Sequence, residues 1–118
     1  MTKVLVVEDN PLNMELVIEI LVARGFTVHE AINGEEAIKK AEAEKYDLIL
    51  MDIELPGIDG VEVTRILKAK NKNTPVVALT SYAMKGDRDR FLAAGFDEYL
   101  SKPLDITDFL NRLEKYKI

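Results

Sequence analysis

The stretch DLILMDIELPGIDG, residues 47–60, places a carboxylate directly after an apolar run that must be buried. Four consecutive apolar residues begin at Leu48, and the Leu-Pro-Gly at 55–57 cannot continue a helix or a strand. Such a run predicts a central strand of a parallel sheet, covered on both faces. Asp52 is therefore expected at the carboxyl end of that strand, where the sheet opens to water.

Outward from this stretch, the chain alternates between short apolar runs and longer segments of helical period. Strands are predicted at 3–7, 26–30, 47–51, 74–80 and 98–101. Helices are predicted at 11–24, 33–45, 60–70, 84–95 and 106–117. Strict alternation implies right-handed crossovers and a parallel sheet with helices on both faces. We therefore expect a doubly wound α/β fold, with residues 1–118 forming one domain.

The composition excludes several classes of protein. A net charge of -5 disfavours a nucleic-acid surface, which needs clustered Lys and Arg in excess. The sequence has no cysteine, which excludes disulfides, iron–sulfur clusters and thiolate zinc sites. The apolar segment at 16–23 is too short to span a membrane, and the N-terminus becomes acidic too early for a secretory signal. We expect a cytoplasmic protein that binds neither nucleic acid nor membrane.

Polar residues lie at or just after the ends of four of the predicted strands, at the sheet edge where open parallel sheets bind their ligands. They are Glu8, Asp9, Asp52, Thr80 and Lys102. Neighbouring carboxylates repel one another, so the cluster predicts a bound cation, and oxygen ligands of this kind suit Mg²⁺. A free oxygen of Asp52 could then attack phosphorus. Mg²⁺ and Lys102 would neutralise the transferred group, and Thr80 would donate a hydrogen bond to it.

Four motifs, in this order, resemble the receiver domain of two-component response regulators over essentially the whole chain. They are VEDN (7–10), LILMDIELPGIDG (48–60), ALTSYA (78–83) and YLSKP (99–103). Residues 10–16 and 83–103 are most similar to stand-alone regulators of the cell-cycle type and to receivers of hybrid kinases. The resemblance implies a flavodoxin-like (βα)5 fold with strand order 2-1-3-4-5.

The resemblance also implies roles for individual residues. Asp52 would be the phosphoacceptor, and Lys102 would pair with the phosphoryl group, ahead of a cis peptide bond to Pro103. Thr80 matches the switch hydroxyl, and Tyr99 matches the aromatic side chain that turns inward. The Mg²⁺ ligands would be Glu8 (mainly through water), Asp9, Asp52 and the backbone carbonyl of Glu54. Two variable positions that flank the phosphate are occupied by Glu54 and Tyr82.

The implied function is a phosphorylation switch. The donor would be a phosphohistidine of a sensor histidine kinase or phosphotransfer protein, and the output would be altered binding of a downstream protein effector. Such a domain assists its own phosphorylation and dephosphorylation but is not a conventional enzyme. The expected output face comprises the last two helices and the strand between them, including Lys85, Arg88, Arg90 and Tyr99. We expect a monomer or weak dimer, and the Met1 start favours a complete single-domain regulator.

Other functions could use a similar sheet. Phosphatases and dehalogenases with an aspartate nucleophile resemble one another in a second Asp two residues later, where this chain has Glu54, and 118 residues leave no room for a lid domain. A flavin or dinucleotide module would need a Gly-rich loop after the first strand, where residues 8–13 are acidic instead. A receiver that has lost phosphorylation is disfavoured by the presence of Asp9, Asp52, Thr80 and Lys102.

The remaining candidates have plainer interpretations. His29, the sole histidine, is expected to be a partly exposed side chain and not a phosphohistidine. In the first helix, the residues expected to face the core are Leu16, Val17, Ile20 and Leu21. A second apolar stripe consists of Met14, Ile18 and Val22. We expect that stripe to pack on a neighbouring helix, against Leu110 and Leu113, in preference to docking a partner's helix bundle.

Overall fold

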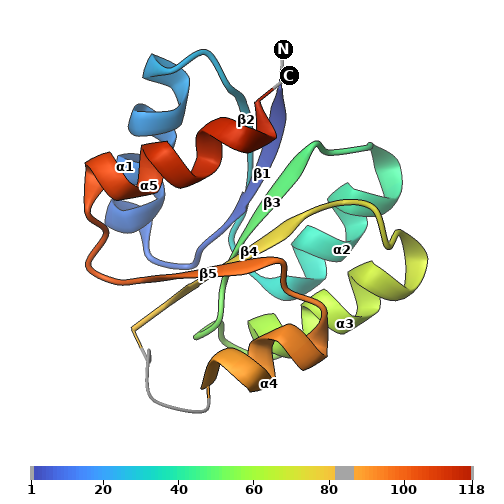
Figure 1. Cartoon of the computed structure of the whole chain (residues 1–118). Helices are drawn as coiled ribbons and strands as arrows, with labels where there is room; N and C mark the ends of the chain where they lie inside the picture. Colours follow the sequence, from blue (N-terminus) through green and yellow to red (C-terminus); the bar gives the residue numbers. More distant parts are fainter. Residues whose placement is uncertain (1, 82–86, 118) are drawn as a thin grey trace.

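The computed structural model describes residues 2–81 and 87–117, in which strands and helices alternate along the chain (Figure 1). The strands are β1 (Lys3–Val7), β2 (Thr27–Ala31), β3 (Leu48–Asp52), β4 (Val76–Thr80) and β5 (Glu98–Ser101). The helices are α1 (Pro11–Ala23), α2 (Gly34–Ala43), α3 (Gly60–Lys70), α4 (Asp87–Ala94) and α5 (Ile106–Leu113), followed by the 3-10 turn η1 (Glu114–Tyr116). The described strands form one parallel sheet in the order β2-β1-β3-β4-β5. The doubly wound, flavodoxin-like fold is confirmed.

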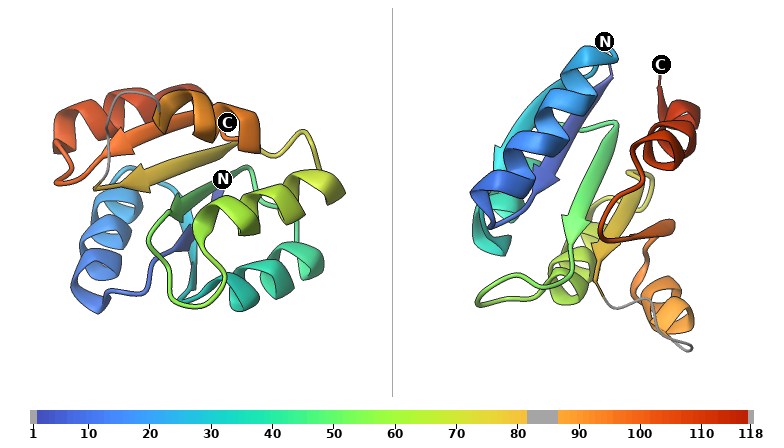
Figure 2. Two further views of the ribbon diagram at one scale, coloured as in Figure 1. Left: turned by 90° about the horizontal axis from the view of Figure 1, so that it is seen from below. Right: turned by 90° about the vertical axis from the view of Figure 1, so that its left-hand side faces the viewer.

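Helices cover both faces of the sheet (Figure 2). One face packs against α1 and α5, and the other packs against α2, α3 and α4. The central strand β3 is buried along its whole length, as its apolar run predicts. None of the described helices is both long and apolar enough to cross a lipid bilayer.

The parallel register brings the carboxyl ends of four strands to one edge. The pairs at this edge are Val7 with Met51, Asp52 with Leu79, and Thr80 with Ser101. The residues that follow β1, β3, β4 and β5 therefore leave the sheet side by side. This edge holds every site residue that the sequence predicts from strand ends.

Several element bounds differ slightly from those predicted, for local reasons. The strand β3 begins one residue later, at Leu48, and the Asp47 carboxylate just before it accepts the Lys3 backbone N–H (2.8 Å). It also ends one residue later, at Asp52, because sheet pairing continues to this residue. The strand β2 is likewise shifted by one residue, and Phe26 is buried in the core before it. Residues 84–86 of the predicted fourth helix lie outside the described residues.

The predicted core face of α1 is partly wrong. The buried residues of this helix are Met14, Val17 and Leu21, and its partly buried ones are Ile18 and Ile20. Leu16 is 45% exposed and Val22 is 56% exposed. Because α1 is apolar nearly all round, its spacing did not show which stripe faces the sheet. Of the second predicted stripe, Met14 and Ile18 share one hydrophobic core with Leu110 and Leu113 of α5, as expected, whereas Val22 does not.

Candidate functional site

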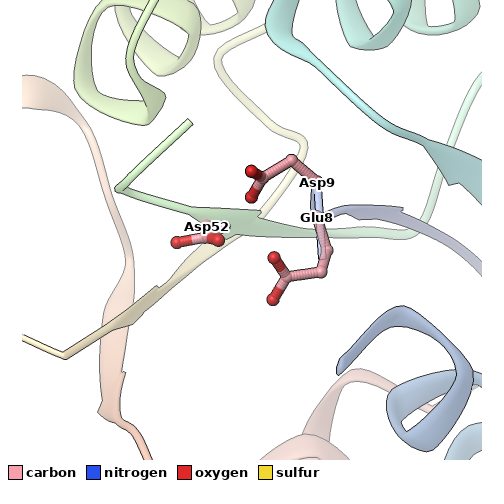
Figure 3. Close-up of side chains that lie close together, drawn as sticks. All are labelled: Glu8, Asp9 and Asp52. Atoms are coloured by element: carbon pink, nitrogen blue, oxygen red, sulfur yellow. The ribbon is translucent and has the colours of Figure 1, made fainter. Parts of the chain in front are cut away.

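Three carboxylates gather at the carboxyl edge of the sheet (Figure 3). Glu8 and Asp9 follow β1, and Asp52 is the last residue of β3. One carboxylate oxygen from each lies within 4.8 Å of the others. Glu8 is 1% exposed and Asp52 is 2% exposed, whereas Asp9 is exposed to solvent. The cluster therefore has a rigid, buried floor and an open side.

Lys102, in the connection after β5, reaches into this cluster. Its ammonium nitrogen lies 3.1 Å from Glu8 Oε1 and 3.1 Å from Asp52 Oδ2. Its backbone N–H donates to the carbonyl of Thr80 at 2.8 Å, which fixes the lysine beside the end of β4. The Lys102–Pro103 peptide bond is cis, as the sequence resemblance implies. Lys102 therefore joins the ends of β1 and β3 through its charge.

The charges in the cluster do not balance. Three carboxylates face the one ammonium of Lys102. Burial, and next the neighbouring Asp52, raise the pKa of Glu8 to about 7. Burial lowers the pKa of Lys102, but contacts with Glu8 and Asp52 outweigh this and raise it overall. Among the described residues the cluster therefore holds more carboxylates than ammonium groups, with or without Glu8, which leaves an excess of negative charge.

This donor set fits a hard divalent cation. Mg²⁺ is bound through oxygen ligands and usually keeps several waters, and the carboxylates of Glu8, Asp9 and Asp52 offer such oxygens. Burial is the main cause of the raised pKa of Glu8, and a cation there would offset both the loss of hydration and the smaller repulsion from Asp52. The backbone of Glu54 also lies beside this cluster, since its N–H donates to Asp52 Oδ1 at 3.0 Å.

The side chain of Glu54 makes a contact that the sequence reasoning missed. Its Oε1 accepts the backbone N–H of Ser81, the first residue after β4, at 2.9 Å. Its Oε2 is buried and has no hydrogen-bond partner among the described residues. The only signal in the sequence was position, because both residues come just after the ends of paired strands.

The predicted switch residues occupy two different environments. Thr80 is fully buried at the end of β4. Tyr99, on β5, is partly buried, and its ring centroid lies 6.0 Å from that of Phe91 in α4. Their roles in switching stay predictions. Tyr82, Lys85 and the side chain of Arg88 lie outside the described residues.

His29 lies on the edge strand β2, away from the cluster. It is partly exposed, as expected. Its Nδ1 lies 2.9 Å from the Tyr46 hydroxyl oxygen and 3.1 Å from a carboxylate oxygen of Glu44. These local contacts explain the position of the His29 side chain, and they give it no role at the acidic cluster.

Comparison with known proteins decides the family. Residues 4–114 match the family model of the response regulator receiver domain. The chain belongs to this family. Receiver domains are phosphoacceptor switches of two-component signalling, not classical enzymes, so the predicted class of function is confirmed. The match supports neither the phosphatase or dehalogenase alternative nor the flavin or dinucleotide module.

Relatives of this receiver domain include both kinds of protein that its motifs suggest. It is 42% identical over 119 residues to hybrid signal transduction histidine kinase G of Dictyostelium discoideum, and covers 4% of that protein with 97% of its own length. It is 42% identical over 115 residues to the polar-differentiation response regulator DivK of Brucella anthropi, with coverage of 96% of this chain and 94% of DivK.

Solved receiver domains have the same fold. The receiver domain of a Pseudomonas aeruginosa sensor histidine kinase, with a magnesium ion coordinated in its active-site cleft, is 37% identical with a TM-score of 0.89, covering 98% of this chain and 96% of that one. The response regulator TrrA of Thermotoga maritima, in complex with Mg²⁺ and a beryllium fluoride, is 37% identical with a TM-score of 0.90. That match covers 99% of this chain and 100% of TrrA.

Proposed function

We propose that Asp52 accepts a phosphoryl group from a phosphohistidine of a sensor histidine kinase or phosphotransfer protein. The observation that carries this proposal is the setting of Asp52. It is a buried carboxylate at the end of a fully buried strand, 3.1 Å from the Lys102 ammonium and clustered with two further carboxylates. A carboxylate held rigidly beside a cation is preorganised for in-line attack on phosphorus.

In the reaction, a carboxylate oxygen of Asp52 attacks the phosphorus of the phosphohistidine. The new O–P bond forms an acyl phosphate, the P–N bond breaks, and the imidazole leaves with the electron pair. Before the attack, the Glu54 N–H on Oδ1 and the Lys102 ammonium on Oδ2 hold the carboxylate plane. Lys102 also neutralises charge on the transferred group. Mg²⁺, with Glu8 (through water), Asp9, Asp52 and the backbone carbonyl of Glu54 as ligands, would supply further positive charge there.

Glu8 has a second use in this scheme. Its Oε1 accepts from Lys102 and its Oε2 accepts the Asn10 backbone N–H at 3.2 Å. The glutamate is therefore fixed at both oxygens and holds the lysine side chain close to Asp52. A lysine positioned in this way loses less conformational freedom when the phosphoryl group arrives.

The output would be a change in protein binding at the surface formed by α4, β5 and α5. Phosphorylation would act through Thr80 and Tyr99, whose contacts must differ between the two states to shift the equilibrium. A groove of about 520 Å³ already lies on this surface, and Leu92, Tyr99 and Arg112 are among the residues that line it. A downstream protein effector would bind there. We further propose that residues 1–118 act as one receiver domain, a monomer or weak dimer, in the cytoplasm.

Amide NMR with fluoroberyllate, a mimic of the phosphoryl group, tests this function. With Mg²⁺ present, we expect large shifts for Asp52, Thr80 and Lys102, followed by shifts in Tyr99 and the rest of β5. The same titration of Asp52→Asn should leave the spectrum unchanged. Shifts of equal size in both proteins would contradict Asp52 as the acceptor, and shifts confined to the sheet edge would contradict the proposed output surface.

A further inference from the structure

We propose that Glu54 is a positioning residue that latches Ser81, the first residue after β4, to the phosphoacceptor loop in the unphosphorylated chain, and that a phosphoryl group on Asp52 releases it. The inference rests on the proposed function and adds to it a route by which the modified residue is coupled to Ser81. It concerns the side chain of Glu54, whereas the proposed Mg²⁺ ligand is its backbone carbonyl.

The first observation is that Glu54 forms hydrogen bonds with Asp52 and with Ser81 at the same time. Its backbone N–H donates to Asp52 Oδ1 at 3.0 Å, and its side-chain Oε1 accepts the Ser81 N–H at 2.9 Å. The two strands involved are already paired, because Ile53 N–H donates to the Leu79 carbonyl at 3.0 Å. Glu54 extends this connection past the strand ends, into the two loops. A displacement of Glu54 must therefore change the contacts of Ser81.

The second observation is that the latch is incompletely satisfied. The other carboxylate oxygen, Oε2, is buried and lacks a hydrogen-bond partner among the described residues. A buried carboxylate oxygen without a donor is unfavourable compared with the same oxygen in water. If the Glu54 side chain moves out to solvent, its buried Oε2 can form hydrogen bonds with water again. Such a contact suits a switch, because a modest perturbation can break it.

The third observation is the sign of the charge that phosphorylation adds. Glu54 stands beside a cluster that already contains the carboxylates of Glu8, Asp9 and Asp52. A phosphoryl group on Asp52 brings further negative charge and bulk to the same opening. Like charges brought to the same opening repel one another, and the repulsion is stronger where the groups are partly buried. The carboxylate of Glu54 is then displaced, and the Ser81 N–H loses its acceptor.

The latch has a thermodynamic consequence. A contact that exists only in the unmodified state stabilises that state, so it lowers the affinity for a phosphoryl mimic. Removal of the Glu54 side chain should therefore favour the activated state. Replacement by glutamine should keep the hydrogen bond to Ser81 but remove the charge repulsion.

Two measurements on four proteins test the latch. The proteins are the wild type, Glu54→Ala, Glu54→Gln and Ser81→Ala, the last being a control that keeps the backbone N–H. The first measurement is hydrogen exchange of the Ser81 amide without any phosphoryl mimic. We expect exchange to be about fivefold faster in Glu54→Ala, which corresponds to one hydrogen bond of ordinary net strength. Glu54→Gln and Ser81→Ala should exchange like the wild type.

The second measurement is the fluoroberyllate dissociation constant at saturating Mg²⁺. We expect binding to be tighter by about fivefold in Glu54→Ala, the same factor by linkage. Ser81→Ala should match the wild type, and Glu54→Gln should bind more tightly than the wild type because repulsion is gone. Equal fluoroberyllate affinity in all four proteins, or unchanged Ser81 exchange in Glu54→Ala, would overturn the latch. Failure of every protein to bind fluoroberyllate, with Ser81 exchange as expected, would instead overturn the proposed function.

Discussion

The ammonium of Lys102 lies 3.1 Å from Asp52 Oδ2, although the two residues belong to opposite halves of the sequence. The same nitrogen lies 3.1 Å from Glu8, so one cation connects the ends of β1, β3 and β5. The parallel sheet brings the ends of these strands to the same edge, and the reach of each side chain then sets the distances. This position gives Lys102 two opposing effects. Its positive charge favours transfer of the phosphoryl group, and it competes with a metal ion for the same carboxylates.

Replacement of Lys102 by alanine should separate these two effects. Without the ammonium, Mg²⁺ no longer competes with a bound cation for Glu8 and Asp52, so its affinity should rise by about tenfold. Phosphorylation by a small-molecule donor should fall by about a hundredfold, because charge on the transferred group is less neutralised. Titration calorimetry and phosphorylation rates measure the two quantities. The exposed Lys39→Ala is the control, and weaker Mg²⁺ binding in Lys102→Ala would contradict the account.

Replacement of Asp9 by alanine should abolish measurable Mg²⁺ binding. Asp9 supplies the exposed carboxylate of the cluster, and its loss leaves two buried carboxylates that Lys102 already pairs. Thermal stability should change little, because exposed surface charges contribute about 0–1 kcal/mol. Glu19→Ala, at an exposed acid on α1, is the matched control. Equal affinity in the wild type and Asp9→Ala would place the metal elsewhere.

Replacement of Gly60 by alanine should destabilise the fold at the site itself. A β-carbon there would lie 2.2 Å from the Asp52 carbonyl oxygen and 2.9 Å from Ile53 Cα, which are backbone atoms that cannot move freely. We expect a loss of about 1–3 kcal/mol in the free energy of unfolding. At Gly57, where φ is +73° and the surrounding space is open, alanine should cost only about 1 kcal/mol. Urea unfolding of both variants checks the order, and a larger loss at Gly57 would contradict it.

Contacts between the turn η1 and Glu98 should make the stability of the fold depend on pH. Burial raises the pKa of Glu98, but hydrogen bonds from Tyr116 and Lys115, and then Arg112, outweigh it and lower the pKa overall. Tyr116 donates to Glu98 at 2.7 Å. Because the folded pKa lies below the unfolded one, this stabilisation is present above the unfolded pKa and is lost as pH falls through the folded pKa.

The test is Glu98→Gln, with Glu114→Gln as a control on the same turn. At neutral pH the Glu98 variant should lose about 1 kcal/mol of unfolding free energy, a figure reduced by the exposure of Lys115 and Arg112. The difference from the wild type should shrink as the pH is lowered from about 7 to about 3. A difference that grows in acid would show that Glu98 is not stabilised as an anion.

Most of the fold could be predicted because its signals are local. The apolar run before Asp52 is short, and Pro56 and Gly57 soon follow it, which favours a buried strand over a helix. The alternation of strands and helices is then enough to predict that four residues share one edge of the sheet: Glu8, Asp9, Asp52 and Lys102. The sequence did not predict which carboxylates would pair with Lys102, because the pairing depends on how far each side chain reaches.

Two features could not be read from the sequence. The apolar residues of α1 fall on several sides of the helix, so spacing alone could not show that Leu16 would be exposed and Met14 buried. The bond from Glu54 to Ser81 depends on a side-chain conformation across two loops. Both are decided by packing between elements distant in the sequence, and no local pattern encodes them.

The most direct test of the central claim is the intact mass of the protein after incubation with acetyl phosphate, with and without Mg²⁺. We predict a gain of one phosphoryl group that requires Mg²⁺ and is absent from Asp52→Asn, whose amide cannot form an acyl phosphate. The variant should stay folded, because asparagine nearly matches aspartate in size and Lys102 still pairs with Glu8. A phosphoryl group retained on Asp52→Asn would contradict the assignment of Asp52 as the phosphoacceptor.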